Sequence, residues 1–352
     1  MNPLRIALLW DDGIHGVLAG ERADGTPRGD VRVAVAAVEQ ALRGAGHITE
    51  RVGIDFPISR FLARLESGAF DLAFNLCEGV GDVATGEIAV TALLDLVPIR
   101  YTGSDPMALA AALDKARAKE ILTARGIPTP RGTLLASGFS RAVELRFPLI
   151  VKPAREDGSL GIEEASVVRD LPALRARVDW VAEHFASASL AEEFVDGREL
   201  NVSVLGEGAE RFALPIGEID FSGMPEGRPR IVSFNAKWRE DTAEFAGTVP
   251  VVPAPLTEPV AARVREAALR AAEAFGVRDY ARVDLRLDRA ENPWVLEVNP
   301  NPDISPDAGV PRAAKVHGWS YDRLILEVVA MAMRRSPQAR RSVRLLEATA
   351  SR

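Results

Sequence analysis

Two acidic side chains and an amide are spaced so that they could share a metal ion. The stretch 281–302 predicts two strands of alternating character, joined by a turn-rich segment. If this hairpin closes symmetrically, Asp284 lies opposite Glu297, and Asn299 lies opposite Arg282. Two facing carboxylates repel each other, and a divalent cation would remove that cost. The two carboxylates and the amide oxygen form a hard ligand set suited to Mg²⁺ shared with substrate phosphates, and a solvated hairpin is the alternative.

Lysines and a glycine-containing loop elsewhere in the chain could bind phosphate groups. Lys152 lies near the end of the apolar strand predicted over 147–153, so its ammonium would face the adjoining crevice. The loop 156–161 follows, and its glycines allow backbone N–H groups to approach anionic oxygens. The excursion 233–250, which carries Lys237, is long enough to be a functional lid or a disordered segment. Each signal is weak alone, because surface lysines and plain turns are common.

A nucleotide would also need a surface for its base and its ribose. The strand predicted over 190–194 runs into a turn, and this region offers carboxylates, backbone amides and an apolar side chain. Backbone groups can pair with an adenine edge, and a carboxylate can accept hydrogen bonds from ribose hydroxyls. Taken alone, such a segment is more often an ordinary strand with a tight turn.

Composition limits the classes of protein to which the chain can belong. Its 352 residues, 47% hydrophobic and 26% charged, predict a globular protein of two or three domains. The net charge of −7 argues against a general nucleic-acid or anionic-membrane binder. Cys77 is the only cysteine and the four histidines lack metal-ligand spacing, which argues against a disulfide framework or a cysteine-based metal cluster. We find no bilayer-spanning apolar run and no signal peptide, so we expect a cytoplasmic protein.

The elements that must position these residues change character along the chain. The first part predicts a parallel α/β domain with strands over 4–10, 48–54, 72–76 and 99–102, and helices over 33–45 and 87–96. A helix that begins after Asp105 is expected to carry Lys115 and Lys119 on its later turns. The second part predicts mostly antiparallel strands over 147–153, 190–194, 200–205, 211–216 and 230–234, with helices over 171–185, 261–274 and 321–333. In the hairpin, Trp294 is expected to share a face with Leu296 and Val298.

Taken together, these segments resemble the ATP-grasp superfamily, and within it the D-alanine–D-alanine ligase-like branch. The resemblance runs from residue 4 to about 333, and the order and spacing of its blocks are more specific than any one block. The blocks are Phe74 with Asn75, 101–104, 113–115 with Lys119, 147–153, 158–161, 192–199, 282–284 and 296–299. The fold implied is α/β and α+β: an N-terminal parallel α/β domain (1–112), a small central α+β domain (113–198), a C-terminal mainly antiparallel α+β domain (199–334) and a flexible tail (335–352).

The resemblance also implies an ATP site with two Mg²⁺ ions, for which Mn²⁺ could substitute. The residues that would bind the nucleotide are Lys115, Lys152, Glu156, Gly158, Ser159, Glu192, Glu193, Phe194, Val195, Glu199 and Lys237. Asp284, Glu297 and Asn299 would bind the metal ions, whereas Arg282, Ser159 and Lys237 would act in catalysis. The implied reaction activates a carboxylate as an acylphosphate, which an amine attacks to form an amide, releasing ADP and phosphate. A nucleotide-binding protein without ligase activity and a small-molecule kinase are the alternatives.

The residues expected near the two substrates depart from the pattern of the family. Gly158 stands where the family has a serine and Trp238 where it commonly has a tyrosine, so the family's latch between those side chains cannot form in the same way. Asp30, Glu78 and Asp303 would line the substrate crevice, with Trp238 nearby. Acids there would favour a cationic group, or they are ordinary turn residues. The partners implied are small-molecule carboxylate and amine substrates, with no nucleic acid and no membrane, and homodimerisation is a family-level expectation.

Overall fold

The N-terminal part of the chain forms a parallel sheet in the order β2-β1-β3-β4. The computed structural model describes residues 2–11, 31–54, 56–81, 83–140 and 142–335. The elements of this part are β1 (Arg5–Trp10), α1 (Val31–Gly44), β2 (Ile48–Gly53), α2 (Ile58–Ser67), β3 (Leu72–Asn75), α3 (Gly86–Leu96) and β4 (Arg100–Tyr101). Ile6 and Leu8 face one core and Ala7 and Leu9 face another, as expected of a parallel sheet covered on both sides. The predicted βαβ opening is confirmed.

Two helices, not one, lead from this sheet to the central part of the chain. They are α4 (Pro106–Leu113) and α5 (Lys115–Ala124). Asp114 has extended backbone angles between them, and its side chain accepts a hydrogen bond from Arg117 N as the N-cap of α5. The expected continuous helix is therefore wrong, since Asp114 acts as a cap. The break places Lys115 at the start of α5 with its N–H on Ala154 O.

The central part is a small antiparallel sheet with a helix on one face. Its strands run in the order β5-β8-β6-β7. Their bounds are β5 (Gly132–Leu135), β6 (Leu149–Pro153), β7 (Val167–Val168) and β8 (Ser189–Glu193). Helix α6 (Leu171–Phe185) packs Leu174, Val178 and Val181 against Leu149 and Val151 of β6. The predicted helix over 171–185 is confirmed.

The C-terminal part is a larger antiparallel sheet in the order β12-β11-β9-β13-β14, with β10 on β9. Its strands are β9 (Gly197–Leu205), β10 (Phe212–Ala213), β11 (Gly217–Asp220), β12 (Val249–Val251), β13 (Tyr280–Asp288) and β14 (Pro293–Asn299). Its helices are α7 (Phe234–Trp238), α8 (Ala243–Ala246), α9 (Glu258–Ala274), α10 (Gly309–Val316) and α11 (Tyr321–Arg334). The strand predicted over 230–234 is wrong, because Ser233 caps α7 and turns the chain into a helix.

The β13–β14 hairpin closes as predicted at its functional end and differs near the turn. Asp284 lies opposite Glu297 and Arg282 lies opposite Asn299. Leu285, however, pairs with Val295, so Leu296 is an extra residue in a β-bulge. Val295 and Val298 therefore both pack in the core beneath α9, and the expected alternation of Trp294, Leu296 and Val298 is wrong.

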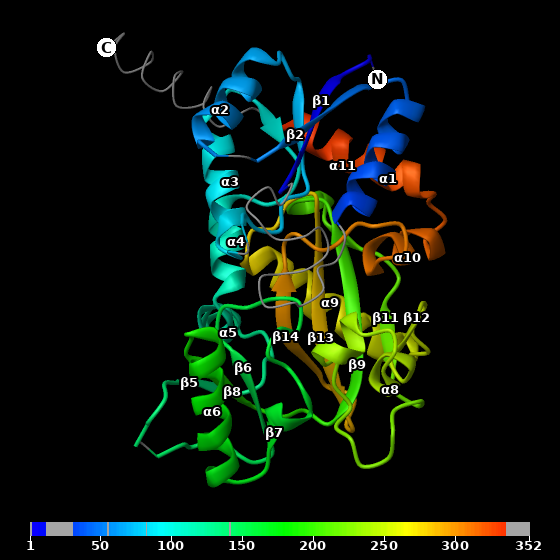
Figure 1. Ribbon diagram of the computed structural model, residues 1–352. Helices are drawn as coiled ribbons and strands as arrows, with labels where there is room; N and C mark the ends of the chain where they lie inside the picture. The colour runs from blue at the N-terminus through cyan, green and yellow to red at the C-terminus, as the bar shows by residue number, and fades with distance from the viewer. Residues whose placement is uncertain (1, 12–30, 55, 82, 141, 336–352) are drawn as a thin grey trace, which may run out of the picture.

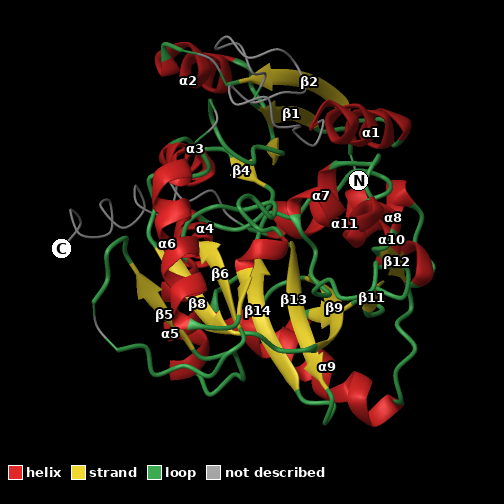
Figure 2. Cartoon of the chain, turned by 60° about the horizontal axis from the view of Figure 1, so that its bottom comes forward, coloured by secondary structure: helices red, strands yellow, loops and turns green. Residues whose placement is uncertain are grey.

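The three sheets pack side by side around one central region. Figure 1 shows the N-terminal sheet at the top, the central sheet at the lower left and the C-terminal sheet beside it. In Figure 2, β6 and β8 lie beside β14 and β13, and Thr129 Oγ1 donates to Val295 O between these two parts at 2.8 Å. Helix α11 returns to the N-terminal sheet, where Leu324 and Val328 share a core with Val35. None of the described helices is long and apolar enough to cross a membrane. The predicted α/β and α+β combination is confirmed.

Candidate active site

A buried carboxylate between two lysines marks the wall formed by the central sheet and α5. Glu192, on β8, is 1% exposed. Lys152 Nζ lies 2.5 Å from its Oε1, and Lys119 Nζ lies 2.6 Å from its Oε2. Burial alone would raise the pKa of Glu192, but the two ammonium groups lower it to about 2. The site therefore keeps one anion and two cations in a region shielded from water.

Lys119 was not assigned a binding role from the sequence, and the structure places it in this cluster. It also donates to Pro130 O at 2.7 Å, so its position on α5 is fixed. The signal that could have found it is its spacing of four residues from Lys115, which places both lysines on one side of a helix. Lys115 reaches a different partner: it donates to the Glu156 carbonyl oxygen and lies 3.5 Å from Asp157 Oδ1.

Two loops above this wall are tied to each other. Gly158 (φ +66°) and Ser159 (φ +62°) adopt left-handed backbone conformations, which form the tight turn of the loop 156–161. Trp238 Nε1 donates to Gly158 O at 2.8 Å, and Ser159 Oγ donates to Val232 O at 2.9 Å. A latch between the loops thus exists, but it joins an indole to a backbone oxygen instead of two side-chain hydroxyls.

The residues predicted to contact the adenine differ in whether their polar groups already have hydrogen-bond partners. The Glu193 side chain points to Arg146, with 3.0 Å between Oε2 and Nη2, and its N–H donates to Arg131 O. The Phe194 N–H donates to Pro148 O. Val195 N–H has no hydrogen-bond partner in the described part of the chain, so it is the candidate donor for a base edge.

The ribose-side candidate Glu199 faces an arginine that the sequence did not single out. Glu199 lies on β9 with its Oε2 3.7 Å from Arg286 Nε. Burial raises the pKa of Glu199, and the Arg286 guanidinium opposes that rise. Arg286 is 3% exposed and also lies over the Phe194 and Phe221 rings. Strand alternation places Arg286 on the same face as Asp284, which was the available signal.

The metal candidates lie on the facing wall, on β13 and β14. Asp284 accepts two hydrogen bonds from Arg282, each 2.7 Å, and one from Asn201 Nδ2, also 2.7 Å. Burial, followed by repulsion from Asp284, raises the pKa of Glu297 to about 7. Asn299 Oδ1 accepts a hydrogen bond from Asn301 N at 2.9 Å. Within the described residues no group of three His, Cys, Asp or Glu side chains could hold a metal, so a site here depends on the amide as third ligand.

These donors fit a hard cation. Two oxygen-bearing acids face each other on paired strands, and the raised pKa of Glu297 shows that a second negative charge is unfavourable there without a counter-ion. Glu297 also interacts electrostatically with Lys152 and Lys115. The β13–β14 hairpin and the wall formed by the central sheet and α5 therefore border the same space. Oxygen ligands of this kind suit Mg²⁺.

The expected substrate residues gather at the end nearest the N-terminal sheet. Reduced solvation, followed by the charge of Asp303, raises the pKa of Glu78 to about 7, although the side chain remains exposed. Reduced solvation lowers the pKa of Lys237, although the side chain is exposed, and Arg282 adds to the shift, whereas Glu78 opposes it. Glu87, which the sequence did not single out, has its pKa raised to about 8 by burial, with Asp157 adding to the rise. Asp30 lies outside the described residues.

Known proteins are similar to this chain in sequence and in fold. Residues 136–330 match the family model described as D-ala D-ala ligase C-terminus. The chain is 33% identical over 352 residues to an uncharacterized protein, y4sG, of Sinorhizobium fredii, covering 94% of this chain and 98% of that one. It is 35% identical over 327 residues to a D-alanine–D-alanine ligase of Bordetella petrii, covering 91% and 92%.

A solved structure of similar fold is the D-alanine–D-alanine ligase from Bacillus anthracis complexed with ATP. The TM-score is 0.71 at 22% identity, covering 94% of this chain and 98% of that one. The sequence matches carry the family assignment, and the structural match confirms the fold. The chain therefore belongs to the D-alanine–D-alanine ligase family of the ATP-grasp superfamily, and it is an ATP-dependent carboxylate–amine ligase.

Proposed function

We propose that this enzyme joins two amino-acid-like substrates through an amide bond in the space between the central and C-terminal sheets. The observation that best supports the proposal is the pairing of two opposite walls. One wall carries Lys119 and Lys152 around Glu192, and the other carries the facing acids Asp284 and Glu297. Cations beside a divalent-metal site are what phosphoryl transfer requires, because its transition state spreads negative charge over several oxygens.

The nucleotide lies along the first wall in this proposal. Lys115 and Lys152 bind phosphate oxygens, and the loop of Glu156, Gly158 and Ser159 covers them. Lys115 fixes that loop through the Glu156 carbonyl. The base pairs with backbone groups near Val195, in the segment formed by Glu192, Glu193 and Phe194, and the ribose hydroxyls donate to Glu199.

Asp284, Glu297 and Asn299 hold Mg²⁺, with two ions as in the family pattern and Mn²⁺ as a substitute. Bound there, the metal supplies positive charge that neutralises phosphate oxygens. The chain's own contribution is positional, because Arg282 and Asn201 fix the Asp284 carboxylate from two sides.

The metal assignment is tested by Glu297→Gln. Without Mg²⁺ this change removes one of two facing charges, so we expect the melting temperature of the variant to equal or exceed that of the wild type. With Mg²⁺ and ATP, we expect wild-type stabilisation by about 2.7 kcal/mol at 100 times Kd and little in the variant. The exposed Glu266→Gln is the control. Equal stabilisation of both variants by Mg²⁺ and ATP would place the metal elsewhere.

Arg282 and Lys237 act on the reacting centre in this proposal. Lys237 lies on α7, which is held over the site by the Trp238 contact with Gly158. Its charge interacts with Glu78, Arg282 and Glu297, so it can stabilise charge that develops during acyl transfer. Ser159 contributes through the closed loop geometry.

Glu78 and Asp303, with Trp238 nearby and Asp30 as the sequence suggests, form the substrate end. Acids at this end favour a substrate ammonium group over a second carboxylate. We further propose that the enzyme acts in the cytoplasm, where ATP is supplied, and that it is a homodimer, which light scattering coupled to gel filtration would test.

The reaction is tested by ADP release with ATP and Mg²⁺ over a panel of amino acids, singly and in pairs, with D-alanine included. Release that needs a pair and yields a condensed mass would establish the ligase and name both substrates. Release with one compound that gains a phosphate would instead establish a kinase. The matched variant is Arg282→Lys, which keeps the charge but loses the bidentate contact with Asp284.

A further inference from the structure

A buried arginine on α6 contacts the end of the loop 156–161. Arg177 is 5% exposed and lies in the helix that packs on the central sheet. Its Nη2 donates to Gly161 O at 2.9 Å and to Ser166 Oγ at 3.0 Å, and its Nη1 donates to the Glu163 carboxylate. One guanidinium therefore holds the chain where the loop ends.

A hydroxyl group beside the guanidinium completes a closed set of hydrogen bonds. The buried Ser166 donates its hydroxyl to Gly161 O at 3.3 Å and accepts a hydrogen bond from Glu163 N at 3.0 Å. The carbonyl oxygen of Gly161 thus accepts from two donors, one of which belongs to α6. Its orientation is determined by that helix and not by the loop alone.

Packing holds the same point of the loop from another side. Gly161 has a left-handed backbone conformation (φ +67°), and a Cβ there would lie 2.8 Å from an atom of the Phe185 ring and 2.8 Å from an atom of the Pro153 ring. Phe185 is the last residue of α6, and Pro153 follows Lys152 on β6. The loop therefore ends against the strand that carries Lys152, at a position without room for a side chain.

Core packing alone does not explain an arginine at position 177. Burial lowers the pKa of Arg177, and the hydrogen bond and the charge of Glu163 oppose that shift. Arg177 Nε is buried and has no hydrogen-bond partner in the described part of the chain. A charged group in such surroundings costs free energy that an apolar side chain of similar volume would not. The hydrogen bonds to the loop are what the arginine adds at this position.

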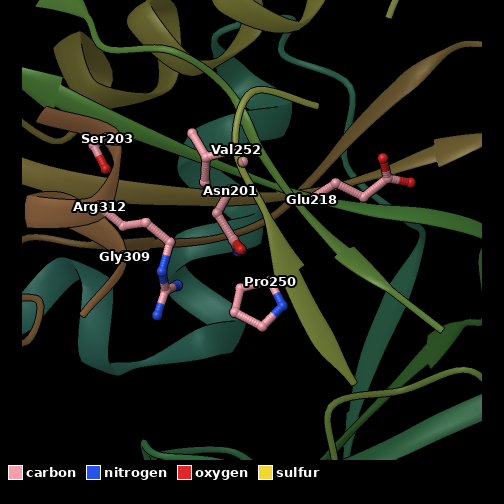
Figure 3. Close-up of a pocket in the computed structure, with 9 residues that line it drawn as sticks. Asn201, Ser203, Glu218, Pro250, Val252, Gly309 and Arg312 are labelled. Atoms are coloured by element: carbon pink, nitrogen blue, oxygen red, sulfur yellow. The ribbon is translucent and has the colours of Figure 1, made fainter. Parts of the chain in front are cut away.

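The end of the loop is also joined to the segment that carries α7. Ile162 O accepts a hydrogen bond from Phe234 N, at the start of α7, at 2.8 Å. That segment continues into β12, which pairs with β11 of the C-terminal sheet. Figure 3 shows Pro250 of β12 at a small pocket of this sheet that Asn201 of β9 also lines. The loop end is therefore bonded to α6 on one side and to a segment anchored on the C-terminal sheet on the other.

We propose that Arg177 is a positioning residue for the phosphate groups of ATP, acting through the Gly161 carbonyl. The inference rests on the proposed function, in which the loop 156–161 covers the phosphates. Because α6 holds Gly161 in place, the loop has one shape before ATP arrives, and its backbone N–H groups need no ordering when they meet phosphate oxygens. The base and the ribose lie against other residues, so their binding does not depend on Arg177.

Binding of AMP and of ATP to the full-length protein with Mg²⁺ tests this role without turnover. We expect Arg177→Met to raise Kd for ATP at least tenfold and Kd for AMP less than twofold. Arg177→Lys, which keeps the charge beside Glu163, should recover part of the ATP affinity. The matched control is Arg175→Met on the same helix, whose exposed guanidinium donates to Phe139 O and which should change neither Kd. Equal weakening of both nucleotides, or unchanged ATP binding, would overturn the proposal.

A second variant, Gly161→Ala, decides the question if Arg177→Met does not fold. The added Cβ would displace the loop end from Pro153 and Phe185, so we expect the same selective loss of ATP affinity. A Gly161→Ala protein that binds ATP as tightly as the wild type would contradict a role for this loop end.

The ligase function is judged separately, by ADP release from the wild type. Release by the wild type together with unchanged ATP affinity in Arg177→Met and Gly161→Ala would refute the role of Arg177 and leave the ligase function standing. Absence of release from the wild type concerns the ligase function itself, because the ratio of the two nucleotide affinities is measured without turnover.

Discussion

Lys119 and Lys152 hold the buried Glu192 carboxylate from two sides. We expect Lys119→Met to lower the free energy of unfolding by about 1–3 kcal/mol, because Glu192 Oε2 loses its partner while Oε1 keeps Lys152. We also expect weaker ATP binding, since a cation is lost from the same wall. Urea unfolding and ATP titration would measure the two effects.

The pH dependence of this cluster provides the control for that variant. The pKa of Glu192 is lowered in the folded protein to about 2, so its contribution to stability is present above the ordinary value of 4.5 and is lost as pH falls toward 2. Lys119→Met should reduce this acid-dependent loss. Lys315→Met, on the exposed side of α10, should change neither stability nor ATP affinity. A Lys119→Met protein as stable as Lys315→Met would contradict the argument.

For Glu87 we expect the opposite dependence of stability on pH. Its pKa is raised to about 8, first by burial and then by Asp157, so its contribution is full below about 4.5 and is lost as pH rises through 8. Asn301 hydrogen-bonds to it at 3.5 Å, and Glu78 adds repulsion. We expect Glu87→Gln to be more stable than the wild type at pH 9 by about 1–3 kcal/mol, and similar at pH 5. Urea unfolding at both values checks this, with exposed Glu66→Gln expected to show no such crossover.

Strand alternation was sufficient to predict the facing side chains at the open end of the hairpin, but not near the turn, where the bulge at Leu296 shifts the register. Asp284 and Glu297 lie opposite each other because each is two residues from its end of the Arg282–Asn299 pair, on the polar face of its strand. Lys119 could not be assigned in the same way, because its role depends on how α5 packs against β8. That packing is a long-range contact that no local pattern contains.

Two side-chain hydrogen bonds, from Trp238 and from Ser159, join the loop 156–161 to the segment that carries α7. Trp238 Nε1 reaches Gly158 O at 2.8 Å, and Lys237 precedes Trp238 on α7. We expect Trp238→Phe, which keeps a ring but loses the donor, to raise KM for ATP roughly fivefold, corresponding to a hydrogen bond of about 1 kcal/mol. Limited proteolysis should cut the 233–250 segment faster in the variant. Trp180→Phe on α6 is the control, and equal KM values in both variants would show that the Trp238 hydrogen bond does not contribute to ATP binding.

Sequence patterns predicted most helices and strands, and their failures have local physical causes. The helix expected to run from Asp105 past Lys119 is split because Asp114 accepts a backbone N–H as a cap. The strand expected over 230–234 does not form. Ser233 instead accepts a backbone hydrogen bond as the N-cap of α7. Neither propensity nor alternation predicted the bulge at Leu296, beside which Val295 hydrogen-bonds to Pro128 and Thr129 of a distant segment.

At the scale of the whole molecule, one buried aspartate joins the N-terminal and C-terminal parts. Asp279, at 0% exposure, precedes β13 and accepts a hydrogen bond from Gly103 N at the end of the N-terminal sheet. It also accepts from Arg335, just after α11, whose Nη2 lies 2.7 Å away and also donates to Tyr101 O. The folded part of the chain therefore extends one residue into the expected tail, and the remainder, 336–352, lies outside the described residues.

We expect Asp279→Asn to lower the free energy of unfolding by about 3–5 kcal/mol, because it leaves the Arg335 guanidinium partly buried without a counter-charge. Asparagine tolerates the left-handed backbone at this position (φ +58°), so the loss would report the charge and not strain. Asp196→Asn breaks the exposed pair with Arg289 and should cost under about 1 kcal/mol. Since the junction links the N-terminal part, which bears Glu78, to the C-terminal part, which bears Arg282, Asp279→Asn should also raise KM for both substrates. Equal stability of the two variants would mean that the domains are held together by the shared apolar core of α1 and α11 instead.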